Sequence, residues 1–422
     1  MNIIHVSDVF IRHGGGAPNV IKELAKYQIA QGNRVKILTF RHQTDWPFEE
    51  EIEGIAVHRA DLKDTRLPFY VSGYRNMRNL AKETLVEFEP DILHLHMPFS
   101  GLAVLDANSS LFRVGGGGEK QIGRGPKVVY TFHGSWAEES AIEASGFKRI
   151  SGLYLLEKLL MKQIEERALF QADTVVTLSQ FMQNEARKYR IKPRSGWKIV
   201  PAGVDLTKFK VKSLPPVAAT TVEAKEGEKL KVKFRKSLGM SENAFLLLCV
   251  RRLARRMGLE ELIDAVEIVR KHIPNVFLII GGKGELHGSL ELKVSGLKLQ
   301  KNIRLEGFIP EEKYADYCAA ADLFILPTQS LEGFGLVILE SLACGTPVLG
   351  TPVGAIPEVI GPFNKDLLTQ SPSATDIADG IIDYRRNYFR QDTKIRTLAR
   401  AYAEKFSWEK MNRKYLEIYQ SH

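Results

Sequence analysis

Short apolar segments alternate with amphipathic segments along the first half of the chain. The predicted strands there are residues 3–6, 35–38, 91–96 and 128–132. Between the first two, the apolar positions of residues 20–31 follow helical spacing, and Gly32 ends this helix. Nearly continuous apolar strands separated by helices predict a parallel sheet that helices cover on both faces.

The same alternation returns in the second half of the chain. The predicted strands there are residues 245–250, 276–282, 303–307, 323–327 and 347–350, and a helix at 259–272 joins the first two. A chain of 422 residues is long enough for two such domains. The sequence therefore predicts an α/β protein with two Rossmann-like domains built on parallel sheets.

The alternation breaks at residues 207–236, where a Pro-rich stretch and a Lys-rich stretch fit no strand-helix unit. We therefore expect an N-terminal domain at 1–206, a basic linker or insert at 207–236 and a C-terminal domain at 237–400. A second insert at 113–126 contains four consecutive glycines and predicts a loop.

The last segment, 401–422, predicts a helix that we expect to pack back toward the N-terminal domain. Its apolar residues at helical spacing are Trp408, Met411, Tyr415 and Ile418.

The chain has a formal net charge of +9 and is 44% hydrophobic, which excludes disorder for most of its length. The basic excess is local, because residues 187–236 hold 15 Lys and Arg against 4 Asp and Glu. This strip either meets an anionic membrane or acceptor, or keeps the insert solvated. We expect no nucleic-acid partner, since few aromatic residues interleave with the basic ones and no DNA or RNA module is recognisable.

The cysteines and the first residues bear on the compartment. Cys249, Cys318 and Cys344 are far apart in apolar segments, which predicts buried free thiols in a reducing environment. Residues 1–10 lack a cationic start and predict a strand rather than a secretory signal, and no apolar run approaches the roughly 18 residues of a membrane span. We therefore expect a cytoplasmic protein.

Glycine-rich turns follow two of the predicted strands. Residues 13–20 read HGGGAPNV, where Gly15 and Gly16 precede a helix. These glycines either let the backbone approach a phosphate or form a tight strand-helix turn. In the second domain, GGKGEL at 281–286 directly follows the apolar residues VFLII and includes Gly282.

Four arginines, Arg251, Arg252, Arg255 and Arg256, follow the strand 245–250. The carboxyl ends of parallel strands are where doubly wound folds bind ligands, and guanidinium groups bind phosphate well. For Arg251 and Arg255, a solvated basic turn is the preferred interpretation.

Two carboxylates, Glu332 and Glu340, flank a helix start that Gly333 and Gly335 precede. Apolar residues occupy most of the helix around Glu340, so its carboxylate requires a polar cleft or a matching donor. This arrangement suits a ligand with phosphates and several hydroxyls. The alternative is one surface Glu and one capping Glu.

Histidines end two of the predicted strands. His133 follows the strand 128–132, and His94 and His96 lie at the end of the strand 91–96. Such histidines either contact a substrate or serve the structure. We predict no metal, because no Asp-x-Asp pair occurs and no carboxylate is spaced to complete a histidine site. The common GxSxG and HExxH templates are absent from the sequence as well.

Taken in order, these segments resemble the family 4 retaining glycosyltransferases, which have the GT-B fold shared with glycogen synthases. The segment from Glu332 to Glu340 resembles the family's Glu-x7-Glu donor motif, and RRLARRMG resembles its Arg-x4-Lys-Gly phosphate clamp. Further similar segments are HGGGAPN, TFHGS, PAGVD, GGKGEL and NIRLEGFIP. The resemblance covers most of the chain, apart from 113–126 and 210–236, and implies two sheets that face a central cleft.

The resemblance implies an N-terminal acceptor domain, a C-terminal donor domain, a nucleotide-diphosphate sugar as co-substrate and no cofactor. Glu332 would contact the donor sugar, Glu340 the ribose, and Arg252 the leaving phosphate. His133 would line the sugar site from the N-terminal domain. The other donor-binding residues that it implies are Gly15, Gly16, Arg256, Gly282, Gly333, Phe334, Gly335, Leu336 and Val337.

Two positions depart from the family pattern. Met257 stands where the clamp has lysine, and we expect the neighbouring Arg256 to supply the charge. The domain junction reads Pro201-Ala202-Gly203 where the family has Pro-Asn-Gly.

The implied reaction is a retaining, metal-independent hexosyl transfer from a UDP- or GDP-sugar to a glycan, a lipid-linked acceptor or a small molecule. A sugar-nucleotide epimerase or a phosphorylase on the same fold is an alternative, although a pyridoxal lysine segment is not recognisable. A nucleotide-sugar-binding protein without turnover is another.

Residues 147–167 combine leucines with lysines and arginines. Such a helix either docks on the anionic cytoplasmic face of a membrane or packs against the core. The core-facing helix is the preferred interpretation.

Overall fold

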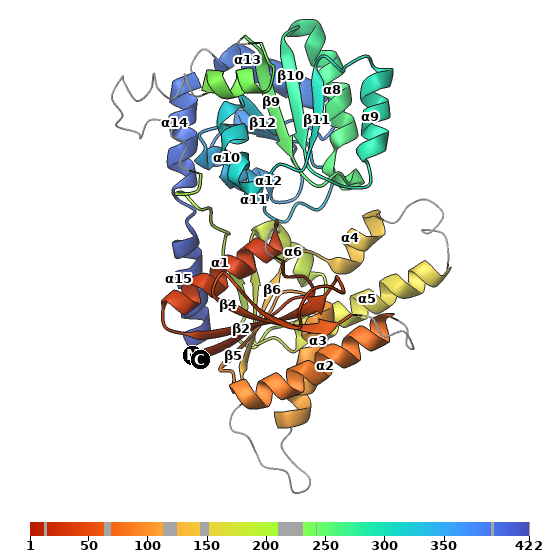
Figure 1. Ribbon diagram of the computed structural model, residues 1–422, viewed down its shortest axis with the longest axis vertical. Helices are drawn as coiled ribbons and strands as arrows, with labels where there is room; N and C mark the ends of the chain where they lie inside the picture. Colours follow the sequence, from red (N-terminus) through yellow and green to blue (C-terminus); the bar gives the residue numbers. More distant parts are fainter. Residues whose placement is uncertain are drawn as a thin grey trace, which may run out of the picture. The chain divides into compact units, whose positions relative to one another are not determined.

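The computed structural model describes residues 1–11, 15–62, 69–112, 125–143, 152–209, 231–241, 243–389 and 392–421. The chain divides into two compact units: unit 1 is 1–201 with 408–422, and unit 2 is 202–407. Each unit is an α/β layer structure with a mainly parallel sheet (Figure 1), as the alternation of apolar and amphipathic segments predicts. The sequence placed the corresponding boundaries at 206 and 400.

Unit 1 contains an eight-stranded sheet in the order β3-β4-β2-β1-β5-β6-β7-β8. Its strands are β1 Asn2–Val6, β2 Arg34–Arg41, β3 Glu49–Ile52, β4 Ile55–Asp61, β5 Ile92–Leu95, β6 Lys127–Phe132, β7 Thr174–Thr177 and β8 Trp197–Ile199. The pairing of β3 with β4 is antiparallel, and the other pairs are parallel. Glu53 and Gly54, both at positive φ, form the tight connection that this hairpin requires.

Most helices of unit 1 pack on the sheet or on a neighbouring helix of the same unit. They are α1 Ala17–Ala30, α2 Phe69–Phe88, α3 Pro98–Phe112, α4 Trp136–Glu143, α5 Gly152–Phe170, α6 Gln180–Arg187 and α15 Trp408–Gln420. The C-terminal helix α15 lies beside α1 (Figure 1). It buries Met411, Tyr415, Ile418 and Tyr419, which share one helical face.

Unit 2 contains a five-stranded parallel sheet in the order β11-β10-β9-β12-β13. Its strands are β9 Phe245–Val250, β10 Val276–Gly281, β11 Ile303–Gly307, β12 Leu323–Leu326 and β13 Val348–Gly350. Its helices are α8 Leu259–His272, α9 His287–Gly296, α10 Glu311–Ala320, α11 Leu336–Ala343, α12 Ile356–Ile360, α13 Ala374–Asn387 and α14 Asp392–Ala403, with short 3-10 turns at Arg255–Met257 and Lys365–Leu367. Strands are added on one side of β9 up to β11 and on its other side from β12 onward, so the strand order reverses between β9 and β12. Doubly wound folds bind ligands at the carboxyl ends of two such strands.

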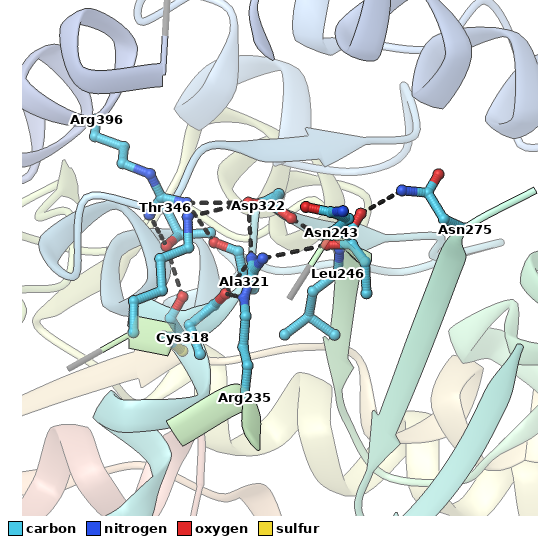
Figure 2. A network of polar contacts seen from close by, with 12 residues as sticks. Arg235, Asn243, Leu246, Asn275, Cys318, Ala321, Asp322, Thr346 and Arg396 are labelled. Carbon is cyan, nitrogen blue, oxygen red and sulfur yellow. Dashed lines mark hydrogen bonds and ion pairs between the residues drawn. The ribbon is translucent and has the colours of Figure 1, made fainter. Parts of the chain in front are cut away.

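A buried carboxylate, Asp322, ties several elements of unit 2 together (Figure 2). Arg235 and Arg396 approach it at 2.8 and 3.8 Å, and the backbone N–H of Leu246 donates to it at 2.8 Å. Lys231 completes the set at 3.1 Å. Burial alone would raise the pKa of Asp322, but the three cations outweigh it and lower that pKa.

This network changes the interpretation of the predicted insert 207–236. Its last part is helical at 231–237, and the charges of Lys231 and Arg235 are neutralised inside unit 2 rather than solvated. Residues 210–230 lie outside the described part of the chain, as do 113–124 of the predicted glycine loop.

The three cysteines are buried and unpaired, as the sequence predicts. Among the helices of the described residues, none combines the length and apolar character that crossing a membrane requires.

Candidate functional site

Three loops at the carboxyl ends of β9, β10 and β12 are joined through their backbones. The N–H of Arg251 donates to Gly281 at 2.9 Å, and that of Leu253 donates to Lys283 at 2.9 Å. The N–H of Gln329 donates to the carbonyl of Arg256, also at 2.9 Å. The loops therefore form one platform at the edge of the sheet where the strand order reverses.

Glycine is required where these loops approach most closely. Gly282 has φ 137°, and a Cβ there would lie 1.7 Å from the carbonyl oxygen of Arg251. Gly258 has φ 72°, and a Cβ would lie 1.8 Å from the oxygen of Pro327. No side chain fits either gap, so these glycines bring the loops together. The close packing of the two loops therefore explains why residue 282 is glycine, whether or not this residue also binds a ligand.

Glu332 is held in this platform by Arg251. The Nη2 of Arg251 lies 2.5 Å from Oε2 of Glu332, and Thr328 donates to the same oxygen at 3.4 Å. The N–H of Ala355 donates to the backbone carbonyl of Glu332 at 2.9 Å. The preferred interpretation of Arg251 as part of a solvated turn is therefore wrong, because its side chain is 7% exposed and paired.

The other arginines of this segment take different positions. Arg252 and Arg255 are exposed, whereas Arg256 donates through Nη1 to the carbonyl of Leu331 at 3.0 Å. Met257, which replaces the lysine of the clamp, is buried with 6% exposure. Its side chain belongs to the core, and Arg256 braces the loop that precedes Glu332.

The N-terminus of α11 directly follows the loop that carries Glu332. Gly335 is its N-cap with φ 81°, and no side chain caps the helix. The first N–H groups of such a helix, here those of Leu336 and Val337, have no intrahelical acceptor and suit an anion. Gly333, in the loop just before Phe334 and Gly335, is partly exposed.

Glu340 lies on the partly exposed face of α11 together with Leu336 and Val337, while the residues between them are buried. Burial raises the pKa of Glu340 to about 7, and the positive charge of Lys208 opposes this shift. Near neutral pH, protonated and ionised forms of this carboxyl group are therefore both present. The protonated form can donate a hydrogen bond, and the ionised form only accepts.

In unit 1, Gly15 and Gly16 are exposed just before α1. Gly16 has φ 62° and ψ −128° and serves as the N-cap without a side-chain hydrogen bond. A residue with a side chain rarely adopts this conformation, so the turn requires glycine there. His13 and Gly14 lie outside the described residues.

His133 follows β6 and contacts a cluster of buried imidazoles. Its Nε2 lies 3.1 Å from Nδ1 of His96. The ring of His5 stacks on that of His96 with centroids 5.2 Å apart, and the ring of His94 is tilted toward it at 4.1 Å. Burial lowers the pKa of His133 to about 4. The sequence predicted His94 and His96 as one pair at a strand end and His133 at another, and the adjacent strands β1, β5 and β6 bring them together with His5.

The histidine cluster also has the residue types of a metal site. One ring nitrogen from each of His5, His94 and His96 lies within 4.8 Å of the other two. However, both ring nitrogens of His94 are already bonded, to Tyr419 at 2.6 Å and to Thr131 at 2.7 Å. The geometry fits a hydrogen-bonded network better than a set of metal ligands.

Glu165 supports the loop that carries His133 and was missed at the sequence level. It accepts from the backbone N–H of Trp136 at 3.0 Å and from Ser135 at 3.3 Å, and Tyr189 donates to it as well. Burial raises its pKa to about 7. Glu165 therefore caps the start of α4, a role that the position of a carboxylate on a distant helix could not reveal.

Helix α5 has an exposed apolar face. Its exposed leucines are Leu155, Leu156, Leu159 and Leu160, with 58, 67, 57 and 47% exposure. The core side of the helix is formed instead by Met161, Glu165, Ala168 and Leu169. The preferred interpretation that these leucines face the core is therefore wrong for the described unit.

Comparisons with known proteins match both units. A family profile described as "Glycosyltransferase Family 4" matches residues 14–208, and one described as "Glycosyl transferases group 1" matches residues 231–405. An alpha-monoglucosyldiacylglycerol synthase of Streptococcus pneumoniae is 26% identical over 83% of this chain and 70% of its own length.

Solved structures agree with the fold. A sucrose-phosphate synthase of Thermosynechococcus elongatus superposes with a TM-score of 0.76 at 19% identity, covering 99% of this chain and 98% of that one. The Anabaena protein HepE in complex with UDP-glucose gives a TM-score of 0.72 at 18% identity, with 99% and 98% covered. The predicted GT-B fold is thereby confirmed.

Proposed function

We propose the donor, the mechanism and the acceptor surface for this chain, which belongs to the group 1 and family 4 glycosyltransferases. The enzyme transfers a sugar from a nucleotide-sugar donor to an acceptor. We propose further that it is a retaining, metal-independent hexosyltransferase that uses a UDP- or GDP-sugar. The observation that carries this proposal is the platform of unit 2, where Glu332 is fixed by Arg251 beside the uncapped N-terminus of α11.

The donor would bind to the platform in three parts. The diphosphate would accept hydrogen bonds from the N–H groups of Leu336 and Val337 and from exposed Arg252. Glu340 would accept from the ribose hydroxyls, and Glu332 from hydroxyls of the sugar. Gly333, Phe334 and Gly335 would shape the turn between the sugar and the diphosphate.

The chemistry needs charge stabilisation on the leaving diphosphate rather than a protein nucleophile. Arg252 and the α11 amides would supply it within a preorganised site. The acceptor hydroxyl would attack from the face that the diphosphate leaves, and a donor phosphate oxygen would take its proton. Because arginine and amide groups provide the positive charge, and the sequence has no Asp-x-Asp pair, we propose that no metal takes part.

The acceptor side would lie at a lipid surface. The four exposed leucines of α5 form an apolar patch, and Lys162, three residues after Leu159, is exposed beside them. Such a helix suits the boundary of an anionic membrane. The buried free thiols fit a reducing compartment, so we propose the cytoplasmic face. The lipid-glycosylating relative from Streptococcus supports a lipid-linked acceptor.

A panel of UDP-, GDP- and ADP-sugars tests the donor assignment by thermal shift, since a ligand that binds the folded state raises Tm with its concentration. We expect stabilisation by UDP- or GDP-sugars and transfer to a lipid-linked acceptor with the anomeric configuration retained. Binding without turnover on every acceptor would indicate a sensor, and isomerisation of the donor would indicate an epimerase.

A further inference from the structure

A row of hydrogen bonds in unit 1 connects α1 with the loop after β6. Oε1 of Gln28 lies 2.8 Å from Nε2 of His5, and Nδ1 of His5 lies 2.9 Å from Nε2 of His96. Nδ1 of His96 then lies 3.1 Å from Nε2 of His133. Gln28, His5 and His96 are buried, while His133 is partly exposed at the end of the row.

The chemistry of these groups gives the row a direction. Burial lowers the pKa of His5 and His133 to about 4 and that of His96 well below its usual value, so these rings are neutral at pH 7. A neutral imidazole has one N–H donor and one acceptor nitrogen. Since a carbonyl oxygen accepts, His5 donates from Nε2 to Gln28.

The remaining protons follow in order. Nδ1 of His5 is an acceptor, so His96 donates to it from Nε2. Nδ1 of His96 then accepts from Nε2 of His133. His133 is left with an unprotonated Nδ1, and no partner for that nitrogen is found within the part of the chain that the structure describes.

The orientation of the Gln28 amide decides this direction. Its Nε2 donates to the hydroxyl of Tyr419 at 3.2 Å, and Tyr419 in turn lies 2.6 Å from Nδ1 of His94. A reversed amide would donate to His5 and would invert every bond of the row, placing the proton of His133 on Nδ1.

We infer that Gln28, His5 and His96 are positioning residues that fix His133 as the Nε2–H tautomer, so that its Nδ1 accepts a hydrogen bond from a sugar hydroxyl of the substrate. The recognition of a sugar rests on the proposed function, whereas the tautomer does not. A lone pair at Nδ1 attracts a hydroxyl hydrogen and is unsuited to a phosphate oxygen, which needs a donor. His133 is thereby assigned to the sugar rather than to the diphosphate.

Long-range 15N–1H NMR of the full chain with labelled histidine tests the tautomer, with the His133 signals identified in His133→Asn. We expect Nε2–H for His5, His96 and His133. In Gln28→Met, which keeps the volume of Gln28 and removes its acceptor, we expect a mixed or inverted pattern. Finding Nδ1–H at His133 in the unchanged protein, an unaltered pattern in Gln28→Met, or histidine signals that change on removal of bound metal would overturn the inference.

Two tyrosines of α15 provide a matched pair. Tyr419→Phe removes the hydroxyl that accepts from the Gln28 amide. Tyr415→Phe also removes a buried hydroxyl, but this one lies 3.0 Å from Oγ1 of Thr131 and does not contact Gln28. We expect a change at His133 in the first variant and none in the second. Equal changes of the His133 signals in both variants would show that they report on packing around α15 and not on the hydrogen bonds of the row.

Transfer kinetics test the link to the sugar. We expect Gln28→Met to lower kcat for transfer about tenfold, the effect of losing one oriented hydrogen bond, while the affinity for the free nucleoside diphosphate stays unchanged. Gln28→Glu, which retains an acceptor for His5, should restore most of the rate. If no nucleotide sugar binds, the proposed function fails while the tautomer result stands. If the tautomer changes and transfer does not, the assignment of His133 to the sugar is wrong.

Discussion

Arg251 and Glu332 form an ion pair in unit 2, in which Nη2 lies 2.5 Å from Oε2 and both side chains are almost fully buried. The pair joins the carboxyl end of β9 to the loop after β12, on the two sides of the point where strand order reverses. A carboxylate held in this way is preorganised, because a rigid partner fixes its rotamer before any ligand arrives.

Substitution of Glu332 by Gln should separate function from stability. The amide keeps the size of the side chain and an oxygen for Arg251, but it removes the charge. We expect transfer to fall by about a hundredfold or more, with Tm close to that of the unchanged protein. Glu332→Ala would instead leave a buried guanidinium unpaired and cost about 3 kcal/mol of unfolding free energy. Undiminished transfer in Glu332→Gln would refute the donor assignment.

Arg252 and Arg255 offer a comparison between neighbours that are both exposed. If Arg252 contacts the diphosphate, Arg252→Met should weaken donor binding by about tenfold, the value of one charge-assisted hydrogen bond. Arg255→Met changes the net charge equally and should leave the dissociation constant almost unaltered. Titration of the donor at two salt concentrations measures both effects. Equal weakening of donor binding in the two variants would show that the positive charge of the turn acts as a whole, without a specific contact by Arg252.

The sequence predicted features that depend on neighbouring residues. Strands such as 245–250 are apolar because both faces of a parallel sheet are buried, and Gly335 with Glu340 lies within one loop-helix segment. The pairing of Arg251 with Glu332 was not predictable in this way. It depends on two loops far apart in sequence that meet at Gly258, where the missing side chain admits the oxygen of Pro327.

The histidine row shows the same limit. His5 and His94 are register partners on β1 and β5, and His133 follows the next strand, β6. Each was visible in the sequence as a polar residue in an apolar strand or at its end. Their contact follows from strand order, which alternation alone leaves open. The prediction for the leucines of α5 was wrong for a different reason. Leucines at helical spacing fit a protein core and a lipid surface equally well, so their pattern does not decide between the two.

Gly282 and Gly288 should respond in opposite ways to alanine. A Cβ at Gly282 would lie 1.7 Å from the carbonyl oxygen of Arg251, and the residue has φ 137°. We therefore expect Gly282→Ala to lower the unfolding free energy by about 2 kcal/mol or more. Gly288 lies near the start of α9, where an added Cβ would have no other atom within 4 Å, so alanine should stabilise by about 0.5–1 kcal/mol. Denaturant unfolding measures both, and a stable Gly282→Ala protein would contradict the packing of the two loops.

The raised pKa of Glu340 predicts a dependence on pH. Between its ordinary value of 4.5 and about 7, the folded protein retains a proton that the unfolded chain has released. Stability therefore falls as pH rises through this window, by at most about 3 kcal/mol. Glu340→Gln removes this contribution, so its stability relative to the unchanged protein should increase from pH 4.5 to pH 8. Glu165, whose pKa is also raised, is present in both proteins and cancels.

Donor binding gives the same residue a second test. An ionised Glu340 accepts hydrogen bonds from both ribose hydroxyls, so donor affinity should increase between pH 6 and pH 8. In Glu340→Gln, affinity should be weaker and nearly flat over this range. Calorimetric titration at several pH values measures both proteins. Parallel pH profiles would show that Glu340 does not contact the ribose.

The exposed face of α5 predicts binding to lipid vesicles. Leu156 and Leu160 are exposed one turn apart, and burying each in a bilayer interface should contribute about 1 kcal/mol or more. The double substitution Leu156→Glu and Leu160→Glu should therefore weaken binding to anionic vesicles by tenfold or more in cosedimentation, without loss of Tm. Leu292→Glu, at a 76% exposed leucine on α9 of unit 2, alters charge and surface in a similar way and should bind as the unchanged protein does. If the α5 substitutions leave vesicle binding unchanged, the proposed membrane contact of α5 is wrong. As a control, both the α5 variant and Leu292→Glu should retain transfer to a water-soluble acceptor.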